Sequence, residues 1–286
     1  MSNLRGVTSR VSRRAVLLGG LGGVAAVGGC SALVEYDVLP GRSRAYTLLG
    51  LKGDQAGVPQ AEAGPRVKGT FRSEARGTEV GWSVAYPPGS ATDAVLPVVV
   101  ALHAGHGTHE TVFSGGLYMD RFLALAVADG VPPFAIAAVD GADGWRRYPD
   151  GTGAGATVVD EFVPMLAKRG LDVDRLALLG WSMGGYGALL LGATTKPAVR
   201  AVVATSPALV EGANEPEFDV YRMREAYADI PLRIDIGRGD AFYRAVMDYE
   251  DGVHPHPDGK VTLGSHTHAY WRAAAPEQMR WLGDHL

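Results

Sequence analysis

The sequence predicts an α/β fold built on a doubly wound, mostly parallel sheet. Short apolar runs alternate with helix-like segments from residue 67 onward. Right-handed crossovers between such strands place helices on both faces of a parallel sheet. The 286 residues, 47% of them hydrophobic, suffice for one sizeable domain of this class. Residues 205–232 leave room only for a short helical excursion, so we expect no large cap domain.

The apolar runs and the residues that break them give the elements in order. We expect strands at residues 69–73, 80–86, 96–102, 134–139, 176–181, 199–205, 232–237 and 260–263. A polar turn around Arg76-Gly77 joins the first two, and Pro87-Pro88-Gly89 ends the second. Helices are expected at residues 116–128, 157–168, 185–194 and 270–285.

The N-terminal residues are expected to direct export. Residues 12–18 resemble the twin-arginine export motif, because Arg13 and Arg14 precede a Gly/Ala/Val/Leu run that is too short and glycine-rich to span a membrane. Residues 27–30 resemble a bacterial lipobox, in which the cysteine, here Cys30, is acylated and becomes the new N-terminus. We therefore expect residues 1–30 to be a signal or lipoprotein peptide. An ordinary secretory peptide or an uncleaved anchor are the alternatives, and each also places the remaining chain outside the cytoplasm.

Composition narrows the classes of partner. The 27 basic and 31 acidic residues show no polyelectrolyte character, so nucleic acid is not an expected partner. Cys30 is the single cysteine, which excludes a disulfide framework and a thiolate metal cluster. Residues 31–65 contain many Pro and Gly breakers and are expected to form a tether between Cys30 and a folded domain at residues 66–286.

Ser182 is the predicted nucleophile. It stands in Gly180-Trp181-Ser182-Met183-Gly184, a Gly-x-Ser-x-Gly motif between an apolar run and a small-residue helical segment. A sharp strand-to-helix turn of this kind exposes the serine hydroxyl above the sheet and requires the glycines for close packing. The alternative is a glycine-rich loop whose serine caps a helix.

The expected acid partner follows the strand at residues 232–237. A serine hydroxyl becomes a good nucleophile when an imidazole takes its proton and a carboxylate orients that imidazole. Asp240 comes after the nucleophile in the chain and lies just beyond the strand, where such an acid is expected. Asp235, within the strand, and Asp248, well beyond it, are more typical of structural or surface carboxylates.

The expected base is His266, directly in the turn after the last strand. His268 is the competing residue, but it already enters the C-terminal helix. His254 and His256 lie between prolines in the loop before the strand. These four histidines have no carboxylate or thiolate at a recognised ligand spacing, so we expect no metal site.

The expected oxyanion hole uses two backbone N–H groups. Met183 supplies one because it follows the nucleophile. Gly105, in the loop after the strand at residues 96–102, is expected to supply the other, with Ala104 beside it. His103 and His106 either stabilise that loop or contact substrate.

These motifs carry a family resemblance. Residues 180–185, Gly-Trp-Ser-Met-Gly-Gly, resemble the nucleophile turn of the esterase branch of the α/β-hydrolase superfamily, which includes esterase D-like enzymes and secreted mycolyltransferases. Gly264-Ser265-His266, with Tyr270-Trp271 behind it, resembles that branch's histidine loop, although His268 stands where a tryptophan is common. The resemblance covers about residues 67–286. It implies the α/β-hydrolase fold, ester chemistry and no cofactor.

The sequence therefore predicts an exported serine carboxylesterase, lipid-anchored at the outer face of the cytoplasmic membrane or secreted. Its substrate would be a small-molecule or lipid ester. With no lid, the pocket walls would come from residues 140–155 and 254–257, which favours short acyl groups over long ones. The alternatives are an acyltransferase of the mycolyltransferase type and a non-catalytic exported binding protein on the same fold.

Overall fold

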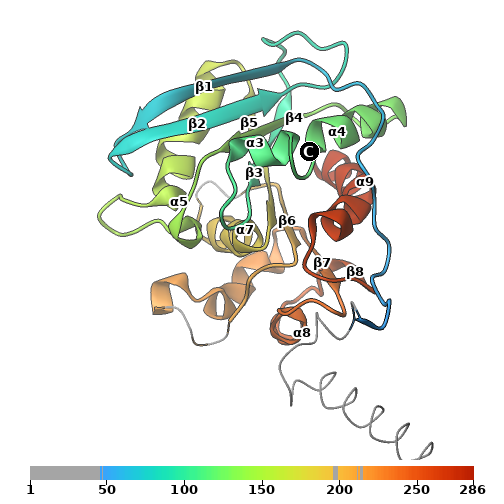
Figure 1. Ribbon diagram of the computed structural model, residues 1–286. Coiled ribbons are helices and arrows are strands. Elements are labelled where there is room, and N and C mark those ends of the chain that lie inside the picture. Colours follow the sequence, from blue (N-terminus) through green and yellow to red (C-terminus); the bar gives the residue numbers. More distant parts are fainter. Residues whose placement is uncertain (1–45, 47, 196–198, 211, 213–214) are drawn as a thin grey trace, which may run out of the picture.

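The computed structural model describes residues 46, 48–195, 199–210, 212 and 215–286 (Figure 1). These residues form one eight-stranded sheet in the order β1-β2-β4-β3-β5-β6-β7-β8. The pairs β1–β2 and β2–β4 are antiparallel, and the other neighbours are parallel. The strands are β1 Arg66–Ser73, β2 Thr78–Ala85, β3 Pro97–Leu102, β4 Ala135–Val139, β5 Asp172–Trp181, β6 Ala201–Thr205, β7 Leu232–Gly237 and β8 Asp258–Thr262.

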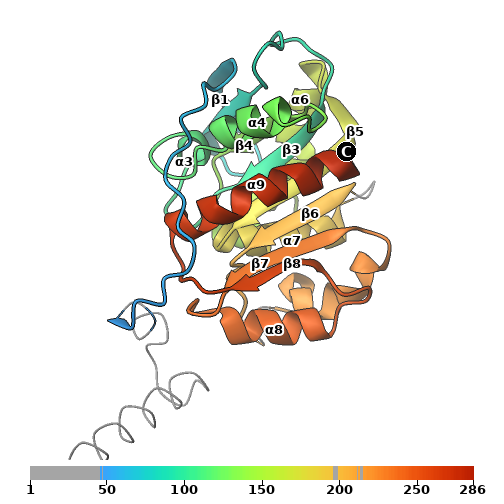
Figure 2. The ribbon, with the colours of Figure 1, turned by 90° about the vertical axis from the view of Figure 1, so that its right-hand side faces the viewer.

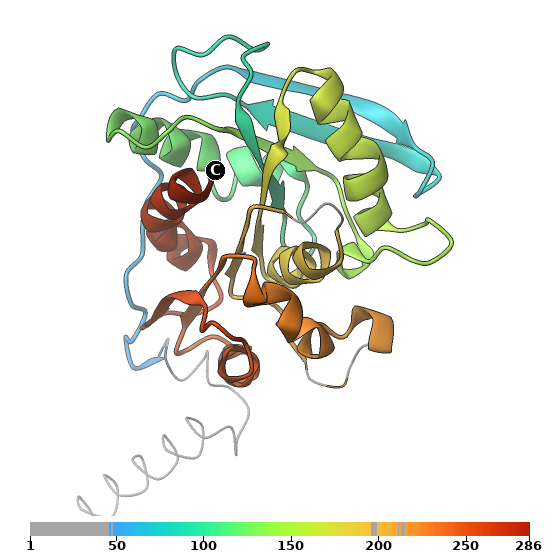
Figure 3. The ribbon, with the colours of Figure 1, turned by 180° about the vertical axis from the view of Figure 1, so that it is seen from behind.

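Helices cover both faces of the sheet. Figure 2 shows α4 and α9 lying side by side across one face, and Figure 3 brings α6 and α7 on the other side to the front. The helices are α3 His109–Phe113, α4 Met119–Ala128, α5 Ala154–Ala156, α6 Val163–Lys168, α7 Met183–Thr194, α8 Tyr243–Asp251 and α9 His268–His285. The described residues also form a π-helical turn, η2 Thr157–Phe162. They contain the 3-10 helices η1 Asp143–Trp145, η3 Pro216–Phe218 and η4 Val220–Ala228.

The core consists of two layers separated by the sheet. In β3, Val98, Val100 and Leu102 join the layer under α7, whereas Val99 and Ala101 join the layer under α4 and α9. All five are fully buried. A continuous apolar strand is what a sheet covered on both faces requires, so the doubly wound architecture predicted from the sequence is confirmed.

Some elements differ from the expected ones. The single helix expected at residues 157–168 consists of the π-helical turn η2 followed directly by α6. At their junction the Val163 N–H donates to the Val158 carbonyl. Pro164 follows at once and has no N–H with which to continue the α-helical ladder, which accounts for the wider turn. The helices α3 and α8 were not expected, because α3 is short and four of the nine residues of α8 are charged.

Two segments bear on the predicted domain organisation. Among the described residues between β6 and β7, only η3 and η4 are helical, so this segment holds no large cap domain, as predicted. Arg13, Arg14 and Cys30 lie outside the described residues. Part of the segment expected to be a tether packs on the domain: the Ala56 N–H donates to the Ala269 carbonyl, 3.0 Å away, and Arg272 donates to the Ala56 carbonyl.

No helix in the described part of the chain combines the length and the apolar composition that crossing a bilayer demands.

Candidate active site

Ser182 occupies the sharp turn between β5 and α7. Its backbone has φ 55° and ψ −117°, a conformation that costs a non-glycine residue free energy and persists only where its surroundings hold it. Hydrogen bonds hold it on both sides: the Ser182 N–H donates to the Thr205 carbonyl, and the Ser182 carbonyl accepts from the N–H groups of Tyr186 and Ala208, each at 3.0 Å. The serine is therefore fixed in a strained position above the carboxyl end of β5.

The glycines of the motif are needed because backbone segments approach closely there. A Cβ atom on Gly180 would lie 1.9 Å from the Gly184 carbonyl oxygen. A Cβ atom on Gly184 would lie 1.9 Å from the carbonyl oxygen of Leu102, the last residue of β3. The start of α7 is thereby pressed against the end of β3, which brings the loop after β3 beside Met183.

Ser182, His266 and Asp240 form one hydrogen-bonded series. His266 Nε2 lies 2.8 Å from Ser182 Oγ, and His266 Nδ1 lies 2.8 Å from Asp240 Oδ2. The Asp240 side chain is fully buried, and its Oδ1 accepts from the Phe242 N–H at 3.0 Å. With Nδ1–H donating to the carboxylate, Nε2 is left as the acceptor for the serine hydroxyl.

The sheet brings these three residues together from distant parts of the chain. Ser182 follows β5, Asp240 follows β7 and His266 follows β8, and the carboxyl ends of parallel strands lie along one edge. The imidazole of His266 is packed edge-on between Phe242 and Trp271, with ring centroids 5.4 and 4.9 Å away. These contacts fix the ring plane, while 25% of the His266 side chain stays exposed.

The competing acids and bases lie elsewhere. Asp235 is buried in an ion pair with Arg233, and Asp248 is exposed beside Arg224. His268 begins α9 with its ring centroid 5.3 Å from that of Trp271. Burial and the nearby Arg272 and His266 lower the pKa of His268, so its ring is neutral at pH 7.

The two remaining candidates are remote from this edge. His254 and His256 are exposed and precede β8, so they lie at the opposite edge of the sheet. Residues 254–257 therefore do not form a wall of the site. That part of the sequence prediction is wrong, because a loop before a parallel strand cannot meet the loops that follow the strands. Among the described residues no group of three His, Cys, Asp or Glu side chains is arranged to hold a metal ion.

The loop after β3 is held by His103. Its Nδ1–H donates to the Ala104 carbonyl at 2.8 Å, and its Nε2 accepts from the Gly141 N–H at 2.9 Å. Burial lowers the pKa of His103, which agrees with a neutral ring that donates at one nitrogen and accepts at the other. His103 thus stabilises the loop, whereas His106 is exposed with φ 60°. Gly105 is also exposed, and a Cβ atom there would meet nothing within 4 Å.

A hollow of about 410 Å³ opens beside Met183. The sequence placed residues 140–155 at the site, and Arg146 and Tyr148 from that loop do line the hollow. Tyr186 from α7 and the exposed Val210 after β6 were not foreseen as lining residues. Tyr186 stands four residues after the nucleophile, one helical turn on, and this spacing is the signal that could have identified it.

Comparisons with known proteins show the fold. No protein-family model matches the chain. No curated protein matches it either. Among solved structures, a ferulic acid esterase superposes with a TM-score of 0.69 at 18% identity, covering 79% of this chain and 100% of the other. An S-formylglutathione hydrolase from Staphylococcus aureus gives 0.64 at 18% identity, covering 77% and 98%.

A third structure is a ferulic acid esterase from Anaeromyces mucronatus in complex with ferulic acid. Its TM-score is 0.66 at 17% identity, and the match covers 79% of this chain and 93% of the other. Likeness at this level of identity concerns the backbone alone. With the strand order and the three loops described above, it establishes that this chain has the α/β-hydrolase fold.

Proposed function

We propose that this protein is a serine carboxylesterase that works through an acyl-enzyme. One observation carries the proposal: Ser182 Oγ, the two nitrogens of His266 and the Asp240 carboxylate form a continuous series with both contacts at 2.8 Å. The strained turn that presents Ser182 supports it, because such strain persists where the surrounding structure enforces it, often at functional sites.

The geometry supplies each proton transfer in turn. His266 Nε2 takes the hydroxyl proton as Ser182 Oγ attacks the ester carbonyl carbon, and Asp240 stabilises the imidazolium. The imidazolium then gives that proton to the departing alcohol oxygen, which leaves an ester on Ser182. A water molecule, deprotonated by the same nitrogen, attacks the acyl carbon, and the imidazolium returns that proton to Ser182 Oγ as the bond to the acyl group breaks and the acid leaves.

The oxyanion that forms at each attack requires N–H donors. We assign the Met183 N–H, at the start of α7, and the Gly105 N–H in the loop after β3. The close approach of Gly184 to Leu102 supports this pairing, because it sets that loop against the start of α7. Ala104 is the neighbouring alternative for the second donor.

The hollow beside Met183 supports a small substrate group. Its volume of about 410 Å³ is at the low end of ligand pockets, and Tyr148 and Tyr186 give it aromatic walls. We propose that short or compact acyl esters are preferred over long chains. Two of the structures that share this fold are ferulic acid esterases, so a compact aromatic ester belongs in the same test.

The test is hydrolysis of p-nitrophenyl esters of graded acyl length by the wild type, with Ser182→Ala as control. We expect kcat/KM to peak at short acyl length. A rise that continues through long chains, or acyl transfer to a sugar that outruns hydrolysis, would contradict this and favour the acyltransferase alternative.

Export and lipid anchoring are part of the same proposal. They rest on the sequence, since Arg13, Arg14 and Cys30 lie outside the described residues. A multiply acylated N-terminal cysteine would give stable membrane attachment, because one acyl chain alone binds only marginally. Mass spectrometry of the mature N-terminus tests this: an acylated Cys30 is expected, and an unmodified start beyond it would leave a freely secreted enzyme.

A further inference from the structure

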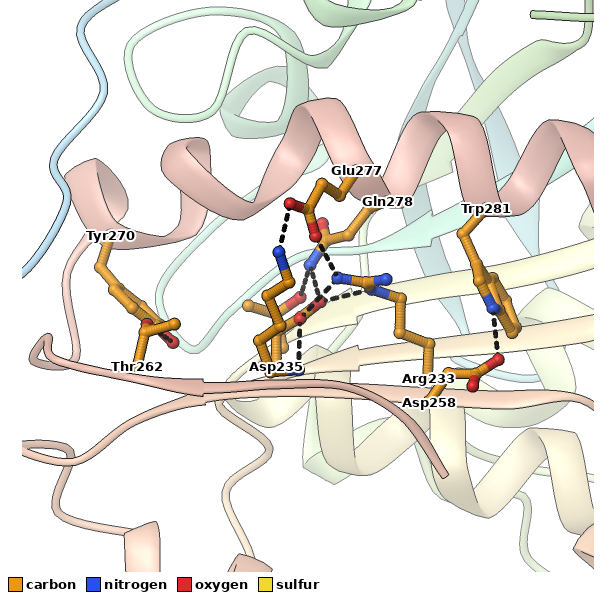
Figure 4. A network of polar contacts seen from close by, with 10 residues as sticks. Arg233, Asp235, Asp258, Thr262, Tyr270, Glu277, Gln278 and Trp281 are labelled. Atoms are coloured by element: carbon orange, nitrogen blue, oxygen red, sulfur yellow. Dashed lines mark hydrogen bonds and ion pairs between the residues drawn. The ribbon is translucent and has the colours of Figure 1, made fainter. Parts of the chain in front are cut away.

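A buried polar network lies between α9 and the sheet (Figure 4). At its centre, Gln278 Nε2 donates to Thr205 Oγ1 and to Asp235 Oδ2, each at 2.8 Å. Thr205 and Gln278 are fully buried, and Asp235 is 2% exposed. One amide on α9 therefore contacts two strands, β6 and β7, near their carboxyl ends.

The Asp235 carboxylate is already neutralised without Gln278. Arg233 Nε and Nη2 donate to its two oxygens at 2.9 and 2.8 Å, and the Lys260 N–H of β8 donates to Oδ1 at 3.0 Å. Burial disfavours the charge of Arg233, but Asp235 and Glu277 together raise the pKa of its guanidinium, so it stays cationic. Gln278 is thus not required to balance the charge of Asp235. Its hydrogen bonds instead fix the position of α9 relative to β6 and β7.

The two residues whose side chains Gln278 contacts, Thr205 and Asp235, adjoin the segments that carry Ser182 and Asp240. The Thr205 carbonyl accepts the Ser182 N–H at 3.0 Å. Asp235 belongs to β7, which leads directly into Asp240, and its carbonyl accepts the Ser206 N–H at 2.8 Å. The helix that bears Gln278 begins just after His266.

The amide is also kept at a cost. Gln278 Oε1 is buried and has no hydrogen-bond partner among the described residues. A buried polar atom left unsatisfied costs free energy, which the two hydrogen bonds of Nε2 offset.

We propose that Gln278 is a positioning residue, whose amide keeps α9 in register with β6 and β7 and so sets the distance between His266 and Ser182. This inference rests on the proposed esterase function. The helix continues from Gln278 back to its first turn beside His266, with Pro276 removing one backbone hydrogen bond on the way, so a displacement at Gln278 is passed along α9 to that turn. Misplacing a reacting group by about 1 Å can reduce turnover by about 10²-fold.

The test compares Gln278→Met, which keeps the side-chain volume, with Trp281→Phe as matched control. Trp281 lies on the same helix and donates to Asp258 Oδ2 at the amino end of β8, 2.8 Å away (Figure 4). We expect Gln278→Met to lower kcat about 10- to 100-fold with KM little changed. Trp281→Phe keeps an aromatic ring at this partly buried position and should leave kcat within about twofold.

A second pair keeps the inference open to refutation if Gln278→Met fails to fold. Thr205→Ser retains the hydroxyl acceptor and should keep kcat near that of the wild type, whereas Thr205→Val removes it and should lower kcat without changing KM. Equal kcat in the two Thr205 variants, or in Gln278→Met and Trp281→Phe, would overturn the inference. The rate of wild-type labelling by a fluorophosphonate separates the two claims, since a wild type that is not labelled refutes the esterase function itself.

Discussion

The two edges of the sheet differ in what they present, and the larger hollow lies at the edge away from Ser182, His266 and Asp240. At the amino ends of β5, β6 and β7, a hollow of about 940 Å³ is lined mostly by apolar side chains, among them Leu176, Val199 and Ile230. At the carboxyl ends, the hollow beside Met183 measures about 410 Å³. Only this second edge holds the hydrogen-bonded series of Ser182, His266 and Asp240. The proposed function therefore rests on where strand ends and polar groups converge and not on the size of a hollow.

Replacing Ser182 should give the largest loss of kcat. Such a loss would locate the activity at the carboxyl ends of the strands. Ser182→Ala should lower kcat by about 10⁶, the loss seen when such a serine is removed from a triad. His266→Ala should be about as damaging, whereas His268→Ala should cost far less, because the His268 ring packs on Trp271 and makes no hydrogen bond to Ser182. Steady-state kinetics on purified, folded variants decides. A severe loss in His268→Ala with activity retained in His266→Ala would transfer the role of base to His268.

Changing the acid should have the next largest effect. Asp240→Asn should lower kcat by about 10⁴, because an amide at this position favours the wrong imidazole tautomer. Asp235→Asn is the comparison, since it makes the same change to a buried carboxylate on β7, the strand that precedes Asp240. If Asp235→Asn lost 10⁴ and Asp240→Asn stayed near the wild type, the acid role would belong to Asp235.

Filling the hollow at each edge of the sheet in turn tests which of the two binds substrate. Val210→Trp would crowd the hollow beside Met183 and should raise KM by about 10-fold, a typical effect of reshaping a binding pocket. Val159→Trp would enter the amino-edge hollow and should leave kcat and KM within about twofold. A larger kinetic effect from Val159→Trp than from Val210→Trp would show that the larger hollow takes part in turnover.

The smallest expected effect is on stability alone. Burial, reinforced by Asp235 and Asp251, raises the pKa of Glu250 in α8 to about 7 from an ordinary 4.5. The stability gained from neutral Glu250 is fully present below pH 4.5 and is lost as the pH rises through about 7. Glu250→Gln should therefore raise the free energy of unfolding at pH 8 by about 1 to 3 kcal/mol, with no gain at pH 4. Denaturant unfolding at both pH values measures this, and equal changes at the two would contradict it.

Local signals made part of this site predictable. Ser182 is marked by glycines whose spacing reflects the close approach of Gly180 to Gly184 and of Gly184 to Leu102. Asp240 and His266 follow strands whose ends were recognisable in the sequence. In the structure His266 lies within hydrogen-bonding distance of both Asp240 and Ser182, as the chain order predicts. Their catalytic roles stay a prediction until the variants are measured.

The features that the sequence did not predict depend on three-dimensional packing. Gln278 is a polar residue within a mixed helix, and nothing in its neighbours along the chain reveals that its amide contacts both Thr205 and Asp235. The loop at residues 254–257 was misplaced because it was judged by composition, although its position before β8 assigns it to the amino edge. Helix α8 escaped prediction because Val246 and Tyr249 are buried among charged neighbours.

Mapping the adduct of a fluorophosphonate probe tests the central claim most directly. The probe reacts with a serine whose hydroxyl is activated, and proteolysis followed by mass spectrometry identifies the modified residue. We expect one equivalent on Ser182 in the wild type, and labelling of His266→Ala that is slower by several orders of magnitude. Absence of an adduct on Ser182 in folded wild-type protein, or labelling of His266→Ala at the wild-type rate, would contradict the account.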